Sequence, residues 1–249
     1  MNFTKNNSNK NSNNVPKFKK SSLKELKPED YPSVSVCTPT FNRRPFIGPL
    51  IECLKKQDYP EEKIEWIVVD DGSDKIEDLV KDLPRVTYIK LDEKVTLGKK
   101  RNIMNSKAKG DFIVYMDDDD YYPEDRISHG VETLLQNPEY LIAGCDKLLI
   151  YYGEPENMLI QIGPYRKNHA TAATFVFRKE LLLNHKYDET KSFGEETSFL
   201  NRFTVPLIQL DGNKTIVVFA HRFNSIDKRF IFNNKKAHKV VEIKEELTK

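Results

Sequence analysis

The stretch DFIVYMDDDDYYPEDRI, residues 111–127, carries the signal on which the fold prediction rests. Its apolar part at 111–116 is typical of a buried strand, and four adjacent aspartates follow it at once. A helical pattern then begins at Arg126 and continues to Gln136. A buried strand, a polar turn and a helix in this order are typical of the β/α units from which parallel sheets are built.

Strand and helix patterns also alternate upstream of this stretch. Residues 33–38, 65–69 and 86–89 are apolar or β-branched runs typical of buried strands, and residues 45–57 and 98–108 have helical patterns. This alternation predicts a parallel sheet with right-handed crossovers.

The second half of the sequence has a different pattern, with more strands, fewer helices and turn residues at Gly153, Gly163 and Asp211. The strand-like segments are 141–152, 172–177, 205–210 and 215–220, and the helical ones are 179–184 and 195–203. We therefore predict an α/β fold in which a mixed, mainly parallel central sheet is flanked by helices and is extended by a partly antiparallel second half.

The two ends of the sequence differ from its centre. Seven of the first fourteen residues are Asn and lysines dominate the charge, so residues 1–30 are predicted to be a disordered arm. A tether to a membrane surface or a polyanion is the alternative for this arm. Residues 233–249 form a charged C-terminal segment, in which VVEIKEEL is predicted as a short helix. One large domain is predicted between the two ends, at 31–232.

Composition excludes several classes of protein. The net charge of +2 over 249 residues is too small for a nucleic-acid footprint. The sequence contains no run of 18 apolar residues, so no transmembrane anchor is expected. The N-terminus also lacks the hydrophobic core of a secretory signal. The three cysteines are too far apart for a metal knuckle and are predicted as buried, reduced thiols, which favours a cytoplasmic location. An organelle address within the polar arm is the alternative.

Ligands of open parallel sheets bind beyond the carboxyl ends of the strands. Four segments occupy such positions here, and all of them carry polar or small residues: TPTFNR at 38–43, DDGS at 70–73, the loop entering Gly98, and the aspartates at 117–120. Their agreement is stronger evidence for a binding site than any one of them.

The four aspartates repel one another, so a counter-charge is expected. Oxygen ligands suit a hard divalent cation, Mn²⁺ or Mg²⁺. An EF-hand is excluded, because the sixth position of such a loop is Tyr122 instead of Gly and the twelfth is Ser128 instead of Glu. The alternative is an acidic turn whose charges face water and a helix dipole.

The first loop contains neither a dinucleotide fingerprint nor a P-loop. Thr38, Thr40 and Asn42 offer hydroxyl and amide groups instead, and Asp71 can accept a hydrogen bond from a base ring. For residues 70–73 an ordinary strand-to-helix turn with a capping residue is the simpler interpretation.

The helix that opens at Gly98 presents backbone N–H groups and Arg101, a combination that suits a diphosphate. Glu195 and Glu196 open a later helix, where carboxylates are commonly stabilising, but sugar transfer also needs one carboxylate to take a proton from the acceptor hydroxyl. His221 ends an apolar strand and is either structural or part of a metal or phosphate site.

At these residues the sequence resembles glycosyltransferase family 2, whose members have the GT-A fold. The resemblance spans about residues 33–230 and implies a single GT-A domain, with a nucleotide-binding half at 31–127 and an acceptor-binding half at 128–232. The matching segments are SVCTPTFNR (35–43), EWIVVDDGSDK (65–75), LGKKRN (97–102), DFIVYMDDDDYYPEDRI (111–127), FGEETSFLNRF (193–203) and AHRFNS (220–225).

The resemblance also implies roles for individual residues. Residues 117–119 correspond to the family's D-x-D motif, although the extra Asp120 leaves its register open. Glu196 corresponds to the general base in a Glu-Asp motif that here reads Glu-Glu, with Glu195 beside it. The expected contacts of the nucleotide-sugar are Thr38, Pro39, Thr40, Asn42, Arg43, Asp71, Arg101, Asp117 and Asp118. The expected ligands of Mn²⁺ or Mg²⁺ are Asp119, Asp117 and His221.

The implied reaction moves a hexosyl or N-acetylhexosaminyl group from a nucleotide-diphosphate donor to an acceptor hydroxyl with inversion. UDP is the favoured nucleotide, with GDP and dTDP open, and the acceptor is a glycan, a protein or a small molecule. The predicted acceptor region is 151–170, where Tyr151, Tyr152, Tyr165 and His169 are candidates for stacking on sugar rings, although ordinary loop packing explains them equally well.

Two alternatives compete with this interpretation. A sugar-1-phosphate nucleotidylyltransferase would carry a Gly-rich loop after the first strand, and residues 38–43 contain no Gly. A non-catalytic nucleotide- or sugar-binding module would not need Arg101, Asp119 and Glu196 together.

Overall fold

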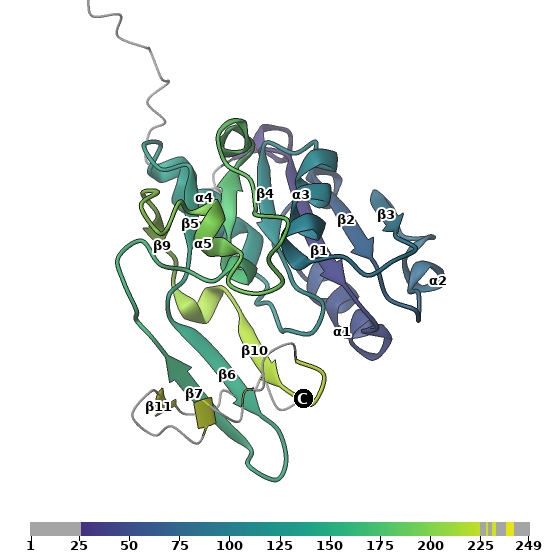
Figure 1. Ribbon diagram of the computed structural model, residues 1–249. Coiled ribbons are helices and arrows are strands. Elements are labelled where there is room, and N and C mark those ends of the chain that lie inside the picture. The colour runs from purple at the N-terminus through teal and green to yellow at the C-terminus, as the bar shows by residue number, and fades with distance from the viewer. Residues whose placement is uncertain (1–25, 225–227, 229–230, 233–237, 242–249) are drawn as a thin grey trace, which may run out of the picture.

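The computed structural model describes residues 26–224, 228, 231–232 and 238–241. These residues form two β-sheets, and Figure 1 shows the smaller sheet below the larger one. The larger sheet has seven strands in the order β3-β2-β1-β4-β8-β5-β9, and the smaller has four in the order β10-β6-β7-β11.

The larger sheet is mixed and mainly parallel, as predicted. β1 pairs in parallel with β2 and β4, and β2 pairs in parallel with β3. β8 runs antiparallel to both β4 and β5, whereas β5 and β9 are parallel. The strands are β1 (Val34–Thr40), β2 (Ile64–Asp70), β3 (Val86–Lys90), β4 (Phe112–Tyr115), β5 (Ile142–Gly144), β8 (Val176–Arg178) and β9 (Ile208–Gln209).

Helices cover both faces of this sheet. α1 (Arg44–Lys55) and α4 (Arg126–Gln136) pack on one face, and α3 (Leu97–Lys107) and α5 (Glu196–Phe199) pack on the other. Every residue of β1 is therefore buried, and successive side chains enter opposite cores, with Val36 beside α1 and Cys37 beside α3. The short helices are α2 (Glu77–Val80), η2 (Pro28–Asp30), η3 (Glu61–Lys63), η4 (Ala172–Thr174), η5 (Lys179–Leu183) and η6 (Gly212–Lys214).

The smaller sheet is joined to the larger one through the turn after β4. It consists of β6 (Leu148–Tyr152), β7 (Met158–Ile162), β10 (Val217–Ala220) and β11 (His238–Val241). β6 and β7 form an antiparallel hairpin, and β10 pairs in parallel with β6. Tyr121 and Val217 exchange two backbone hydrogen bonds, of 3.0 and 2.9 Å. The acidic turn is therefore fixed directly to the second sheet.

Several predicted elements of the second half were wrong in extent. The run 141–152 is divided into β5 and β6, and the predicted strand at 172–177 begins as a 3-10 turn. β7 was not predicted at all. The helix predicted at 195–203 ends at Phe199, because three consecutive residues, Asn201, Arg202 and Phe203, have positive φ and cannot continue a right-handed helix.

Both predicted end boundaries also change. Residues 28–30, which we assigned to the disordered arm, form η2, and Leu26 packs against the main core. In the charged C-terminal segment, His238–Val241 pairs with β7, so Val240 and Val241 belong to a strand instead of the predicted helix. The rest of that predicted helix, and residues 1–25 of the arm, lie outside the described residues.

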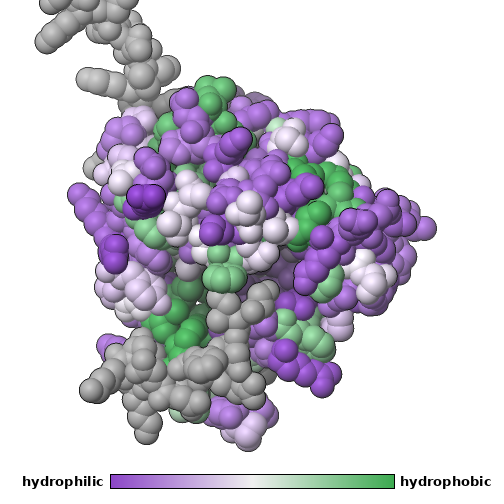
Figure 2. All heavy atoms as spheres, in the orientation of Figure 1, coloured by the Kyte–Doolittle hydropathy of each residue, from purple (hydrophilic) through white to green (hydrophobic). Residues whose placement is uncertain are grey.

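The face shown in Figure 2 is mostly hydrophilic, with separate apolar patches. In the part of the chain that the structure describes, no helix combines the length and apolar character needed to cross a bilayer. The three cysteines are buried and unpaired, as predicted.

Candidate active site

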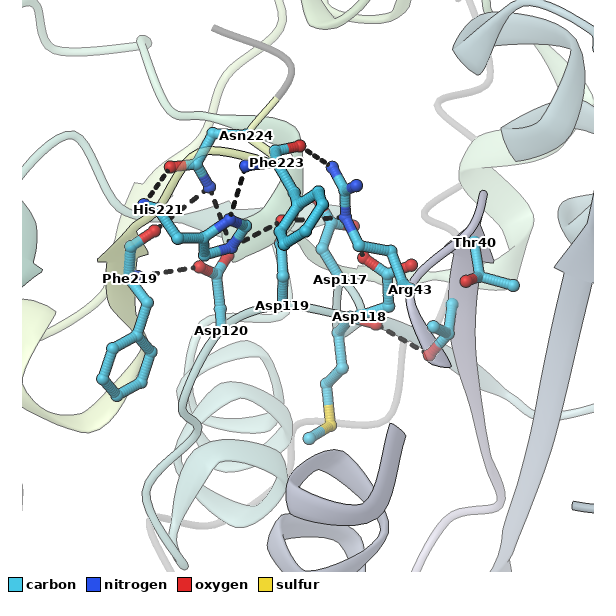
Figure 3. A network of polar contacts seen from close by, with 12 residues as sticks. Thr40, Arg43, Asp117, Asp118, Asp119, Asp120, Phe219, His221, Phe223 and Asn224 are labelled. Carbon is cyan, nitrogen blue, oxygen red and sulfur yellow. Dashed lines mark hydrogen bonds and ion pairs between the residues drawn. The ribbon is translucent and has the colours of Figure 1, made fainter. Parts of the chain in front are cut away.

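The aspartates at 117–120 occupy the turn after β4 and face the segment 219–224 of the second half (Figure 3). The Asp117 amide donates a hydrogen bond to the Tyr122 hydroxyl, and the Phe219 amide donates one of 3.2 Å to Asp120 Oδ1. The turn is thus tied back on itself and to β10, which fixes where the carboxylates point.

Asp119 is the centre of a small polar cluster (Figure 3). Its Oδ2 lies 3.3 Å from Arg43 Nε and 3.2 Å from His221 Nε2. Arg43 also donates to the carbonyl oxygen of Phe223, so one guanidinium connects the first loop, the acidic turn and the late segment. Burial raises the pKa of Asp119, but the hydrogen bond from His221 and the charge of Arg43 outweigh burial and lower it.

The neighbours of Asp119 are in a different electrostatic state. Burial and the charge of Asp119 raise the pKa of both Asp118 and Asp120 well above the usual value. Asp118 Oδ2 is buried and has no hydrogen-bond partner within the described structure. A buried carboxylate oxygen without a hydrogen-bond partner is stabilised by a proton or by a bound cation. The turn would therefore be stabilised by additional positive charge.

Arg101 joins the acidic turn to the start of α5. It is 1% exposed, its Nε lies 2.8 Å from Glu195 Oε1, and its Nη2 lies 3.3 Å from Asp117 Oδ2. The guanidinium also stacks over the Tyr115 ring, 4.6 Å from its centroid. Because Arg101 is buried and paired on two sides, its role in the structure is to hold the Asp117 and Glu195 carboxylates in place.

Glu195→Gln is expected to destabilise the fold by about 1–3 kcal/mol, because Arg101 would lose one of its two buried charged partners while Gln keeps the side-chain size. Thermal and urea unfolding measure this change. Glu61→Gln is the matched control, since Glu61 pairs with Arg85 at an exposed site where such bridges contribute little. An unchanged midpoint in Glu195→Gln would contradict the structural role.

Glu196 is the first residue of α5 and is partly buried. Its pKa is raised by burial and, second, by the charge of the neighbouring Glu195. Glu195 is neutralised by Arg101, whereas Glu196 has no ion pair within 4.0 Å among the described residues. The two predicted catalytic carboxylates therefore differ: Glu195 is buried and paired with Arg101, whereas Glu196 has a raised pKa and no ion pair among the described residues.

A cleft of about 360 Å³ lies beside the acidic turn. Of the predicted nucleotide-sugar contacts, Pro39, Thr40, Arg43, Asp117 and Asp118 line it. Asp119 lines it too, whereas Arg101 lies behind Asp117. The residues that sequence reasoning missed are Phe41, Lys94, Val95, Leu97, Lys100, Ser192 and Phe193.

The missed residues supply features that a nucleotide needs. Lys94 Nζ lies 4.1 Å from the centroid of the half-buried Phe41 ring, so an aromatic ring and a cation both contribute to the lining of the cleft. Phe41 belongs to the quoted 38–43 loop and could have been found there as an aromatic platform. Phe193 opens the quoted segment 193–203, and Lys94 lies in the loop entering Gly98, but neither side chain was predicted as a contact.

Besides Arg101, three predicted contacts do not line this cleft. The Thr38 hydroxyl is buried and bridges the Met116 carbonyl oxygen and the Trp66 indole N–H. Asn42 Oδ1 accepts from the Asp74 amide and so holds the loop after β2. Asp71 accepts from Lys100 Nζ at 2.6 Å and from the Val95 amide at 2.7 Å. These side chains shape the walls of the cleft from behind.

Asp118 and Asp119 also line a second cavity of about 470 Å³ on their other side. Its lining includes the aromatic side chains of Phe46, Tyr151 and Phe219. The predicted acceptor residues are not all brought together. Tyr151 lines this cavity, and Tyr152 is buried with its hydroxyl donating to the Lys228 carbonyl oxygen. Tyr165 and His169 form a tilted ring contact elsewhere.

The donor set of the turn fits a divalent cation that is held jointly with a ligand. Among the described residues, no three His, Cys, Asp or Glu side chains converge as a complete metal site. Asp119 and His221 nevertheless point at each other within 3.2 Å, and one or two side chains plus phosphate oxygens is the usual way in which Mg²⁺ is held. The Phe223 amide donates to His221 Nδ1, and His221 Nε2 faces the turn, 3.2 Å from Asp119 Oδ2 and 3.1 Å from Asn224 Nδ2.

The family model of Glycosyl transferase family 2 matches residues 35–204. The chain belongs to this family. The match covers the first loop, the acidic turn and the Glu195–Glu196 pair, whereas the segment AHRFNS at 220–225, which contains His221, lies outside it.

Curated relatives within this family include proteins of known activity. A poly(ribitol-phosphate) β-N-acetylglucosaminyltransferase, TarS of Staphylococcus aureus, is 28% identical over 135 residues, which is 52% of this chain and 24% of TarS. The GalNAc(5)-diNAcBac-PP-undecaprenol β-1,3-glucosyltransferase of Campylobacter jejuni is 28% identical over 192 residues, which is 69% of this chain and 60% of the relative. The chain thus spans about a quarter of the first relative and 60% of the second.

Solved structures of glycosyltransferases have the same fold as this chain. TarS residues 1–349 in complex with UDP-GlcNAc align with a TM-score of 0.60 at 19% identity, covering 77% of this chain and 60% of that one. The mannosyltransferase PcManGT from Pyrobaculum calidifontis, in complex with GDP-Man and Mn²⁺, aligns with a TM-score of 0.61 at 18% identity, covering 79% and 59%. The predicted GT-A fold is confirmed.

Proposed function

We propose that this chain is a glycosyltransferase that moves a sugar from a nucleotide-diphosphate donor, with UDP-sugars favoured, to an acceptor hydroxyl with inversion and with the help of Mn²⁺ or Mg²⁺. The observation that carries the proposal is that Asp117, Asp118 and Asp119 line one cleft together with Arg43 and Lys100. Family membership supports it, and the UDP-GlcNAc and GDP-Man complexes of structural neighbours support this class of donor.

The cleft provides groups for each part of such a donor. The aromatic face of Phe41 suits the base, and the cations Arg43 and Lys94 suit the diphosphate. Asp119 and His221, with Asp117, would hold the divalent cation, which when bound supplies positive charge against the diphosphate of the leaving nucleotide. Asp119 has the lowered pKa in the turn and is therefore ionised and ready for a cation.

Glu196 would act as the general base. Its carboxylate takes the proton of the acceptor hydroxyl as that oxygen bonds to the anomeric carbon of the donor sugar. The bond between the anomeric carbon and the diphosphate oxygen breaks at the same time, and the nucleoside diphosphate leaves with the bonding electrons. Attack opposite to the leaving group inverts the anomeric configuration. Glu195, held by Arg101, fixes the N-terminus of α5 from which Glu196 projects.

A thermal-shift panel tests donor and cation binding directly. UDP-GlcNAc, UDP-glucose, GDP-mannose and dTDP-glucose are each measured with and without Mn²⁺. A donor at 100 times its Kd adds about 2.7 kcal/mol of stability, and each kcal/mol raises the Tm of a chain of this size by about 2–4 °C. We expect a UDP-sugar to give the largest shift, and only with Mn²⁺. No shift with any donor would contradict the proposal.

Product analysis separates this function from its two alternatives. A glycosyltransferase releases a nucleoside diphosphate from the donor, slowly to water and faster to an acceptor. A nucleotidylyltransferase joins a sugar-1-phosphate to a nucleoside triphosphate and releases pyrophosphate. A non-catalytic binding module releases neither a nucleoside diphosphate nor pyrophosphate.

The pH dependence of kcat is expected to fall on the acid side at a higher pH than an ordinary glutamate would give. Glu196 must be deprotonated to act as a base, so activity is lost as pH falls through its pKa. Because burial and Glu195 raise that pKa above the ordinary value of 4.5, the loss begins at higher pH. The profile is measured at saturating donor, with unfolding followed at each pH. An acid limb below pH 4.5 would contradict the assignment.

A further inference from the structure

A polar groove of about 670 Å³ lies away from the acidic turn, between the β6–β7 hairpin, the loop that follows β7 and η6. The proposed chemistry does not use it, although part of its lining belongs to the predicted acceptor region at 151–170. The side chains that carry the argument are Lys147, Gln161, Tyr165, Arg166, Lys167 and Asn213.

The groove has a small excess of positive charge, carried by exposed side chains. Lys147, Arg166 and Lys167 are exposed, and within the described residues none of them lies within 4.0 Å of a carboxylate. Asp146 and Asp211 also belong to the lining, where Asp146 Oδ2 accepts from the Tyr165 amide and Asp211 Oδ1 accepts from the Asn213 amide. These amides leave both carboxylates charged, so three cations and two carboxylates give the lining a net charge of +1, and its exposed cations remain without an ion pair.

An exposed aromatic ring stands in the same lining. Tyr165 is 52% exposed, and its ring packs on His169 with a centroid distance of 4.8 Å. His169 in turn stacks on Phe203 at 4.7 Å. The Tyr165 ring is held by this stack while part of its surface faces solvent, and such a rigid aromatic face suits the C–H surface of a sugar ring. Gln161 and Asn213 add amide groups that can bond hydroxyls.

Two connections lead from the groove toward the candidate active site. The first runs along one face of β6: Leu149 lines the groove, and Tyr151, about 7 Å further along the strand, lines the cavity beside Asp118. The second is the aromatic stack itself, because Phe203 lies four residues beyond the end of α5, the helix that begins with Glu196. A ligand longer than one sugar could therefore occupy the groove while its end lies at the acidic turn.

We propose that this groove binds an anionic saccharide chain, bearing carboxylate or phosphate groups, as the distal part of the acceptor. The proposal rests on the proposed function and narrows the acceptor class. A nucleic acid fits less well, because the lining offers a single exposed aromatic ring and only three cations, and the whole chain carries a net charge of only +2.

Isothermal titration with a defined probe tests the groove without requiring turnover. The full chain is titrated at low ionic strength with a tetragalacturonate oligosaccharide. The comparison ligands are the neutral galactose tetramer, inorganic polyphosphate and a single-stranded oligonucleotide of the same charge. We expect the uronate to bind at least about tenfold more tightly than the neutral tetramer, because charge-assisted hydrogen bonds are the strong ones.

Variants locate the binding. Lys147→Gln, Arg166→Gln and Lys167→Gln combined should weaken uronate binding about tenfold or more, and Tyr165→Ala should weaken binding of the uronate but not of polyphosphate. The matched control removes three exposed charges elsewhere, with Lys81→Gln, Lys107→Gln and Lys109→Gln, and should bind as the wild type does. Equal loss in the control, no uronate binding, or equally tight binding of polyphosphate or the oligonucleotide would overturn the proposal.

The donor assay keeps this outcome separate from that of the proposed function. If the chain transfers sugar from a donor but shows no preference for the uronate, the groove proposal fails and the enzyme assignment stands. If the uronate binds through the three cations but no donor is consumed, the enzyme assignment fails and the groove remains a saccharide-binding site.

Discussion

Asp119→Ala is expected to lower cation-dependent donor turnover by about 10²–10³-fold, the usual effect of removing one electrostatic stabiliser of a transition state. Asp119 is the carboxylate in the turn with a lowered pKa, and it lies between Arg43 and His221 on the wall of the cleft. Steady-state release of nucleoside diphosphate, measured across a range of Mn²⁺ concentrations, reports the loss.

Asp120→Asn provides a matched control in the same turn. Asp120 does not line the donor cleft, and the amide oxygen of Asn can still accept the hydrogen bond from the Phe219 amide. Turnover in this variant should stay within about fivefold of the wild type, a difference of only about 1 kcal/mol. Asp119→Ala should also keep its circular dichroism spectrum and remain folded. Near-normal Mn²⁺-dependent turnover by folded Asp119→Ala would refute the cation role.

Glu196→Gln is expected to reduce kcat by about 10²–10⁴-fold while leaving donor affinity unchanged, because the amide fills the same space but cannot take a proton. Donor binding is measured by titration and kcat at saturating acceptor. The remaining activity of Glu196→Gln should also lose the acid limb of its pH profile.

Glu195→Gln is the companion for this experiment as well. If Glu195 only positions α5 through Arg101, its variant should lose stability and retain much more activity than Glu196→Gln. If Glu195→Gln has the lower kcat of the two variants, Glu195 is the general base and Glu196 is the positioning residue. Normal transfer by Glu196→Gln would place the base elsewhere.

The first half of the fold could be predicted because its strands are buried on both sides. Such strands are continuous apolar runs, and each is followed by a polar turn, so the pattern itself marks the edge of the sheet where the site lies. The smaller sheet gave a weaker signal. β7 has only five residues, MLIQI, and this run is too short to distinguish a strand from a loop by its pattern.

The residue types of the site could be predicted from the sequence, but the directions in which their side chains point could not. Thr38, Asn42 and Asp71 belong to the expected segments, but a sequence does not reveal that a hydroxyl or carboxylate points inward to a neighbouring strand or loop. The contact between Arg43 and Phe223 joins residues that are 180 positions apart, so no local sequence pattern predicts it. The difference between Glu195 and Glu196 likewise depends on Arg101, 94 residues before Glu195.

The pair of backbone hydrogen bonds between Tyr121 and Val217 has a consequence for how such a chain can diversify. A new acceptor preference requires new loops on the smaller sheet, yet any shift of β10 along its axis would pull the aspartates out of alignment with the nucleotide. Recombination that exchanges the whole second half between family members must therefore preserve the register at this junction and the pairing of β10 with β6, whereas changes in the turn between β6 and β7 and in the loop after β7 leave that pairing in place.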